Sequence, residues 1–87
     1  MADIYVQPKQ WVNAYTAAGL PVGTAMLLQN KGDPVLLQEA AEQPSAVSDD
    51  GFYLAAGRSV EVDAGSPGVW IKAPFQISRL FVQEVLS

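Results

Sequence analysis

Carboxylates are the side chains in this sequence that could perform acid–base chemistry, and most of them lie in closely spaced pairs. The pairs are Glu39 with Glu42, Asp49 with Asp50, and Glu61 with Asp63. Hydrolysis of a glycosidic bond needs two carboxyl groups that face one another across a cleft. A domain of this length offers little room for such a cleft. We therefore interpret these pairs as solvated charges on turns and on one strand face, and we expect no enzymatic activity.

Other reactive groups are absent from the sequence, which contains no cysteine and no histidine. The chain therefore lacks the usual general base near neutral pH, the thiol nucleophile, and the common ligands of zinc. Residues 48–51, Ser-Asp-Asp-Gly, have the clustered oxygen atoms that Ca²⁺ prefers, but they lack the alternating ligands and the bidentate Glu of an EF-hand loop. The same tetrapeptide is ordinary turn chemistry. We expect no metal, and since no nucleotide-binding glycine spacing occurs, no cofactor.

Length and composition predict one small domain that would gain stability from neighbours. A chain of 87 residues is near the lower end of domain sizes, buries a modest share of its surface, and here has no disulfide to stabilise it. Only 16% of the residues are charged, against about 25% in typical soluble domains. A lightly charged surface indicates that part of it is covered by another chain.

The charge distribution argues against two kinds of partner. The net charge is −4, and the five basic residues are dispersed, whereas nucleic-acid affinity requires clustered Lys and Arg. The longest apolar run, residues 52–56, is far shorter than the roughly 20 residues that a membrane-spanning helix needs. The first residues do not resemble a secretion signal. We expect no nucleic acid and no membrane as partners, and synthesis in the cytoplasm, with use there or export inside a larger particle.

Turn-forming residues recur at short intervals, in the segments 18–21, 30–34, 48–51, 56–57 and 65–68. Short apolar segments separated in this way are typical of all-β domains. The clearest strand is 59–63, where valines alternate with acidic residues. Further strands are expected at 10–16, 24–30, 35–39, 69–72 and 77–86. The predicted fold is all-β, a small antiparallel β-sandwich or barrel of about six to seven short strands, with an N-terminal arm at 1–9 and a single β-domain at 10–87.

The pattern predicts where strands lie better than it predicts which strands pair or whether a segment is a strand or a helix. We expect residues 24–30 and 35–39 to form one hairpin, and 59–63 and 69–72 another. A helix is the alternative for 33–43, because Asp33 could cap it and Pro34 could open it. The C-terminal segment 77–86 also has helical spacing, but we favour a strand that completes the sheet.

Aromatic side chains are the residues most able to contribute packing or binding energy. We expect Trp70 and the three phenylalanines in the core. Tyr5, Trp11 and Tyr15 are the candidate interface residues, because tryptophan and tyrosine concentrate at subunit interfaces and these three lie in or beside the arm. The arm could then dock on a neighbouring chain.

Several stretches together carry a resemblance to a known family. They are residues 11–15 (WVNAY), 23–30 (ending LLQN), 35–40 (VLLQEA), 50–52 (DGF) and 68–73 (GVWIKA). This arrangement resembles small β-rich virion structural proteins of tailed bacteriophages. The resemblance implies a non-enzymatic virion protein, a capsid decoration or other head-associated component, with copies of itself and the major capsid protein as partners. It assigns no catalytic residue.

Other functions remain alternatives to the head-associated role. One is a tail, collar or fibre-attachment component. Another is a small carbohydrate-binding or receptor-binding β-module that uses Trp11, Tyr15 or Trp70 as a stacking platform. The exposure of these aromatic side chains distinguishes the possibilities, because a stacking platform must be open to solvent.

Overall fold

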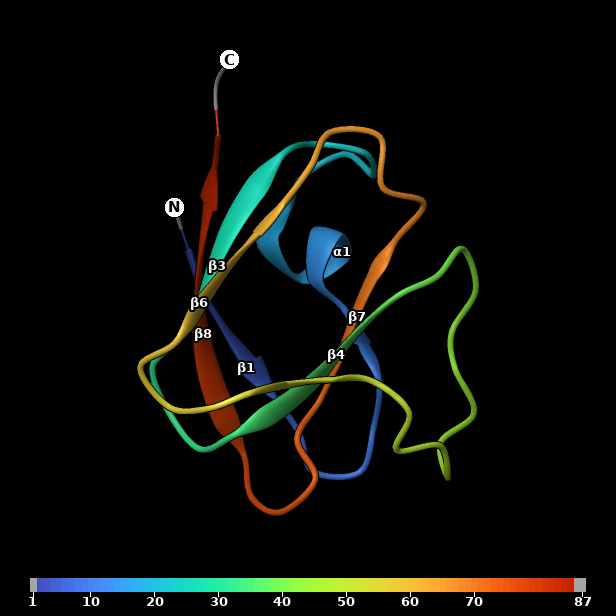
Figure 1. Cartoon of the computed structure of the whole chain (residues 1–87), viewed down its shortest axis with the longest axis vertical. Coiled ribbons are helices and arrows are strands. Elements are labelled where there is room, and N and C mark those ends of the chain that lie inside the picture. Colours follow the sequence, from blue (N-terminus) through green and yellow to red (C-terminus); the bar gives the residue numbers. More distant parts are fainter. Residues whose placement is uncertain (1, 86–87) are drawn as a thin grey trace.

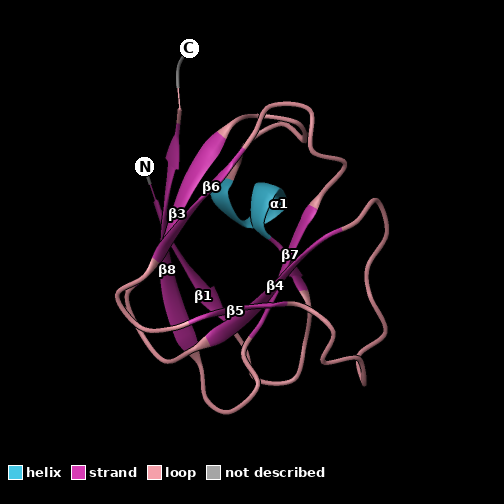
Figure 2. Cartoon of the chain, viewed as in Figure 1, coloured by secondary structure: helices cyan, strands magenta, loops and turns pink. Residues whose placement is uncertain are grey.

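Eight short strands and one helical turn form the structure, a computed structural model that describes residues 2–85. Their bounds are β1 Ala2–Val6, β2 Val12–Asn13, α1 Ala14–Ala18, β3 Met26–Asn30, β4 Val35–Glu39, β5 Phe52–Leu54, β6 Ser59–Val62, β7 Val69–Lys72 and β8 Ser78–Glu84. Strands account for 43% of the residues and helix for 6%, so the expected all-β class is confirmed (Figure 2). The strand count exceeds the expected six to seven. In this described part, no helix is long and apolar enough to cross a membrane.

The strands form two four-stranded antiparallel sheets. The first sheet has the order β1-β8-β3-β6 and the second has the order β2-β7-β4-β5. Figure 1 shows the first sheet on the left, the second on the right, and α1 between their upper parts. Alternation along the strands gives each sheet one buried face: in β8, Leu80 and Val82 are buried while Phe81 between them is partly exposed.

The buried faces of both sheets and α1 contribute to a single hydrophobic core. It comprises Ile4, Val6, Ala14, Tyr15, Met26, Leu28, Val35, Leu37, Leu54, Val62, Val69, Ile71, Ala73, Leu80 and Val82. The predicted alternation of 59–63 is confirmed, since Val62 is buried and Glu61 is exposed. The strand at 77–86 is also confirmed as β8; Leu86, which we included in it, lies outside the described residues.

Both predicted hairpins are wrong, although all four of their strands exist. β3 pairs with β6 and β8, while β4 pairs with β5 and β7, so each turn connects the two sheets instead of joining neighbouring strands. Asn30 is the physical reason at the first turn. Its buried side chain donates to the carbonyl oxygens of Asp33 and Leu54 and accepts from Gly32 N, which links the end of β3 to β4 and β5 across the core.

The expected strand at 10–16 is reduced to the two residues of β2, and α1 follows directly. Asn13 caps the helix, because its Oδ1 accepts hydrogen bonds from the backbone N–H groups of Tyr15 and Thr16 at 2.9 and 3.2 Å. Gly19 ends it with φ of 74°, a left-handed conformation that glycine adopts without strain. Local capping thus prevails over the weak alternation of this segment.

The segment that we interpreted as an arm contains strand β1. Residues Ala2–Val6 pair with β8 of the same chain, from Ala2 opposite Val82 to Val6 opposite Ser78. Ile4 and Val6 are buried in the core. Met1 lies outside the described residues. The segment therefore completes the first sheet within one chain.

Substitution of Gly68 by alanine is expected to lower the free energy of unfolding by about 2 kcal/mol, as overpacking of a tight site typically does. A Cβ atom on Gly68 would overlap the carbonyl oxygen of Ala40, and the Gly68 carbonyl accepts a hydrogen bond from Ala40 N. Urea unfolding measures the change. Pro67→Ala, at an exposed position of the same turn, is the control and should cost less than about 1 kcal/mol. Equal losses for both variants would contradict the steric explanation.

Candidate binding groove

A row of four side chains crosses the outer face of the second sheet. Leu36 lies opposite Lys72 on one side and Tyr53 on the other, in the registers of β4 with β7 and with β5. Trp11 extends the row, because the next residue, Val12, pairs with Ile71, which precedes Lys72. The row therefore runs Trp11, Lys72, Leu36, Tyr53 from one edge of the sheet to the other.

The loop of residues 40–51 covers the Lys72 end of this row. Lys72 Nζ donates to the carbonyl oxygens of Ala46 and Ser48, both at 2.8 Å, and to Asp49 Oδ1 at 2.9 Å. An ammonium group has three protons to donate, so its hydrogen-bonding capacity is filled. Only 3% of Lys72 is exposed. A buried lysine thus fixes the middle of the loop to the sheet.

Trp11 anchors the beginning of the same loop. Its Nε1 donates to the Ser45 carbonyl at 3.0 Å, and its own carbonyl accepts from Gln43 Nε2 at 3.0 Å. Lys72 Nζ lies 5.7 Å from the centre of the Trp11 ring, within the range of a cation–π interaction. The loop is therefore an ordered part of the outer face.

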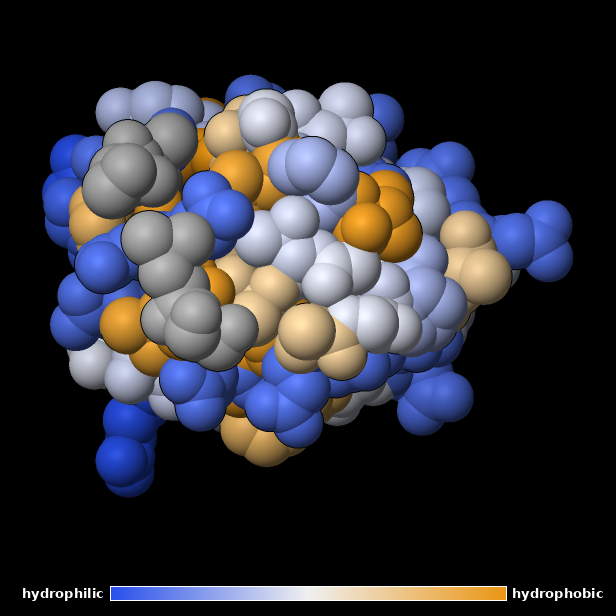
Figure 3. All heavy atoms as spheres, turned by 90° about the horizontal axis from the view of Figure 1, so that it is seen from above, coloured by the Kyte–Doolittle hydropathy of each residue, from blue (hydrophilic) through white to orange (hydrophobic). Residues whose placement is uncertain are grey.

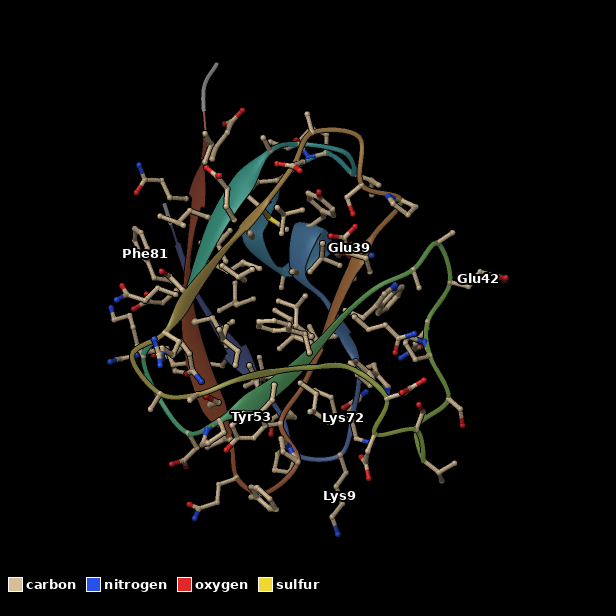
Figure 4. The ribbon with its side chains drawn as sticks, in the orientation of Figure 1. Lys9, Glu39, Glu42, Tyr53, Lys72 and Phe81 are labelled. Carbon is tan, nitrogen blue, oxygen red and sulfur yellow. The ribbon has the colours of Figure 1, made fainter. Side chains whose placement is uncertain are left out.

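The uncovered half of the row is the floor of a groove with a volume of about 650 Å³. Its lining is mainly apolar and comprises Lys9, Leu36, Ala46, Val47, Asp49, Tyr53, Lys72, Pro74 and Phe75. Tyr53 is 57% exposed and Phe75 is 70% exposed, so both aromatic rings are accessible. Figure 4 places Tyr53, Lys72 and Lys9 together in the lower part of the molecule.

Among the described residues that line the groove, Asp49 supplies the one carboxylate. It accepts a hydrogen bond from Lys72, whose donors are already used, while Lys9 is exposed at the rim. Paired acid–base catalysis would require a second carboxyl group facing the first. The arrangement fits the binding of an apolar surface and offers no pair of groups for hydrolysis.

The acidic pairs singled out in the sequence lie elsewhere or have structural contacts. Glu39 accepts a hydrogen bond from Ser66 Oγ at 3.2 Å, and Glu42 projects outward from the loop (Figure 4). Within residues 2–85, no group of three or more Asp and Glu side chains is placed to hold a metal ion. Asp49, in the segment 48–51 whose clustered oxygen atoms were weighed against a calcium site, forms an ion pair with Lys72 at 2.9 Å.

The three candidate interface residues are not brought together. Tyr5 is 60% exposed on β1, in the first sheet. Trp11 is 2% exposed beneath the loop, and Tyr15 is fully buried with its hydroxyl donating to the Thr24 carbonyl at 2.9 Å. Neither Trp11 nor Tyr15 has surface to offer another chain, so of the three only Tyr5 can contact one.

The expectation of a core position is wrong for all three phenylalanines and for Trp70, since none of the four belongs to the core. Phe52 is 56% and Phe75 is 70% exposed, and neither belongs to the core. Phe52 lies on β5 at the edge of the second sheet, and Phe75 follows Pro74 after the end of β7. Trp70 and Phe81 are partly exposed.

Sequence reasoning missed the residues that form the groove. Lys72 was assigned no role, although a lysine that closes an otherwise apolar strand, Val-Trp-Ile-Lys, is a signal for a buried and paired ammonium group. Pro74 next to Phe75 signals a loop and therefore an exposed ring. No sequence signal places Val47 beside them.

A second, smaller hollow of about 330 Å³ lies beside the first sheet, lined by Tyr5, Lys31, Gly32, Asp33, Ile77, Ser78 and Arg79. Its basic groups are near a carboxylate: Lys31 Nζ lies 3.3 Å from Asp3 Oδ1, and Arg79 Nε lies 4.0 Å from Asp3 Oδ2. It is half the size of the groove and less apolar. We therefore regard the groove on the second sheet as the candidate functional site.

Comparison of the chain with protein-family models, with curated proteins and with solved structures found no match.

Proposed function

We propose that the chain is a non-enzymatic structural protein of a bacteriophage particle, a capsid decoration or other head-associated component. It acts by burying the groove on the second sheet against a neighbouring protein of the particle. The observation that supports this role is the apolar groove itself, in which the rings of Tyr53 and Phe75 are accessible and one side is formed by the loop that Lys72 holds to the sheet. The phage setting comes from the resemblance noted in the sequence.

The shape and chemistry of the groove favour apolar side chains of a protein as its occupant. Tyr53 and Phe75 provide aromatic anchors of the kind that dominate protein interfaces, and Lys9 and Asp49 add one charge of each sign. The other end of the molecule differs. Seen from above in Figure 3, apolar residues there lie in separate small areas among polar ones.

The carbohydrate-binding alternative loses its main support. Trp11 and Tyr15 are buried, and Trp70 Nε1 donates to the Ala40 carbonyl at 2.9 Å beneath the start of the loop. These three rings therefore form no open stacking platform. The tail, collar or fibre-attachment role uses the same kind of contact as a head-associated role, so it stays within the proposal as a second location.

Analysis of purified particles tests this role. Particles banded on a density gradient, from cultures that produce the phage encoding the chain, should contain it in a fixed ratio to the major capsid protein. Detection only in the unassembled fraction would overturn the proposal. Particles separated into heads and tails then distinguish the two locations.

Replacement of both groove aromatics, as Tyr53→Ser with Phe75→Ser, should reduce incorporation into particles by more than tenfold, because truncation of an aromatic anchor costs about 2 kcal/mol or more of binding energy. Both rings are more than half exposed, so folding should be little affected. Val22→Ser, at an apolar residue that is 58% exposed outside the groove, is the matched control. Full incorporation of the double variant would contradict a role for the groove.

A further inference from the structure

Strand β1 is attached to the molecule by one of its edges. It is the outermost strand of the first sheet and pairs only with β8 among the described strands. Its inward side chains, Ile4 and Val6, fill places in the core, and Asp3 on the outer face pairs with Lys31 and Arg79. A cavity lined by apolar and main-chain groups would remain if β1 left, and an identical strand would fill it.

The segment that joins β1 to the rest of the chain holds backbone strain. Lys9 has φ of 60°, and no other described residue except glycine has a positive φ. Lysine has a Cβ atom that disfavours this conformation, unlike the glycines at the remaining positive-φ positions. The preceding residue is Pro8, which fixes its own φ and favours an extended conformation of Gln7.

The tight turn at Lys9 is what returns β1 to its own β8. Lys9 N donates to the Ala73 carbonyl at 2.8 Å, and Pro8 forms an isolated bridge with Ala73. If residues 7–10 extended instead, the strain at Lys9 would be released, and β1 would point away from its own sheet. Short strained hinges favour exchange of a terminal element between identical chains.

We propose that β1 exchanges between two copies of this chain, so that β1 of each copy pairs with β8 of the other. Every contact that β1 makes within one chain is available in the exchanged pair, because the two copies are identical. The partner is thus a second copy, and the interface is the β1–β8 ladder with its core side chains. Exchange of β1 would join copies of the chain to one another, in line with the proposed structural role. The exchange does not depend on the groove on the second sheet.

Cysteine cross-linking between two singly substituted variants tests the exchange. The sequence contains no cysteine, so each introduced thiol is the only one in its chain. Tyr5 lies opposite Arg79 in the β1–β8 register, and directly opposed antiparallel residues have Cα separations suited to a disulfide. The Tyr5→Cys variant is mixed with an isotope-labelled Arg79→Cys variant at high concentration, unfolded, refolded together and oxidised.

The proposal requires a disulfide between residues 5 and 79 of different chains, at a yield several-fold above the control. The control pairs Tyr5→Cys with Val22→Cys, an exposed residue outside the ladder, which reports random collisions. Mass spectrometry of the labelled peptides identifies the two chains. A 5–79 yield no higher than the 5–22 yield would overturn the proposal.

The hinge gives an independent readout. Lys9→Gly relieves the positive-φ strain and should lower the exchanged fraction, measured as dimer by size-exclusion chromatography with light scattering after refolding. Deletion of Lys9 shortens the segment that leads β1 back to its own β8, and it should raise the exchanged fraction. The result that overturns the role of the hinge is an equal dimer fraction in the natural chain, in Lys9→Gly and in the deletion variant.

Discussion

Lys72→Met should lower the free energy of unfolding by about 3 kcal/mol, because it removes three hydrogen bonds donated by a buried ammonium group. Methionine retains the length of the apolar stem, so the packing against Trp11 is largely kept and the change isolates the charge. The carbonyl oxygens of Ala46 and Ser48 lose their donor. The loop of residues 40–51 should then detach from the sheet, even in the folded molecule.

Two measurements check this expectation. Urea unfolding gives the change in stability, and hydrogen exchange in residues 40–51 should accelerate well beyond that in β3 and β8. Asp49→Asn is the matched control: the Asp49 side chain is 74% exposed, so the loss of its charge should have little effect on stability. If Lys72→Met were no more destabilising than Asp49→Asn, the loop would not be held by the ammonium group.

Asn30→Ala should also cost about 3 kcal/mol of folding free energy, because it leaves several buried backbone groups without a partner. Asn30 is fully buried, and its Nδ2 donates to Asp33 O and Leu54 O at 2.9 Å each. Its Oδ1 accepts from Gly32 N at 2.8 Å and lies 3.2 Å from Ser78 Oγ. One amide thus joins the ends of β3 and β5 and the start of β8.

Ser78→Ala provides the graded comparison for Asn30. Ser78 Oγ donates its one proton to Asp33 O at 2.6 Å, so the alanine variant loses this hydrogen bond while the asparagine amide remains. A loss of about 1 kcal/mol is expected from this change. Thermal or urea unfolding of both variants should show the larger loss of unfolding free energy for Asn30→Ala. The reverse order would contradict the role of the Asn30 amide in joining β3, β5 and β8.

Five strand positions were predictable from the sequence, whereas β1, β5 and the pairing of the strands were not. The alternation in 59–63 and the apolar segments 24–30, 35–39, 69–72 and 77–86 depend on local pattern, and the structure contains a strand within each. Pairing depends on the direction in which each turn leads the chain. After β3 the chain enters the second sheet, because the Asn30 side chain donates a hydrogen bond to the carbonyl oxygen of Leu54, 24 residues away. No pattern within the turn reveals that contact.

The candidate site was less predictable than the fold. The sequence indicates that aromatic residues carry binding energy, but exposure depends on which side of a sheet a ring occupies and on what covers it. Trp11 is covered by a distant loop through Ser45, and Phe75 is left exposed after the end of β7. The long-range contacts of Lys72 explain the cover over Trp11, since they hold the loop over that half of the row and leave the other half open.

The most direct test of the groove as an interface is photo-cross-linking within assembled particles. A benzophenone amino acid replaces Tyr53 in one variant and Val22 in the other, and both are irradiated in purified particles. The account predicts that the Tyr53 variant forms a covalent product with an identifiable particle protein or second copy, while the Val22 variant does not. Equal products from both positions, or none from Tyr53, would contradict it.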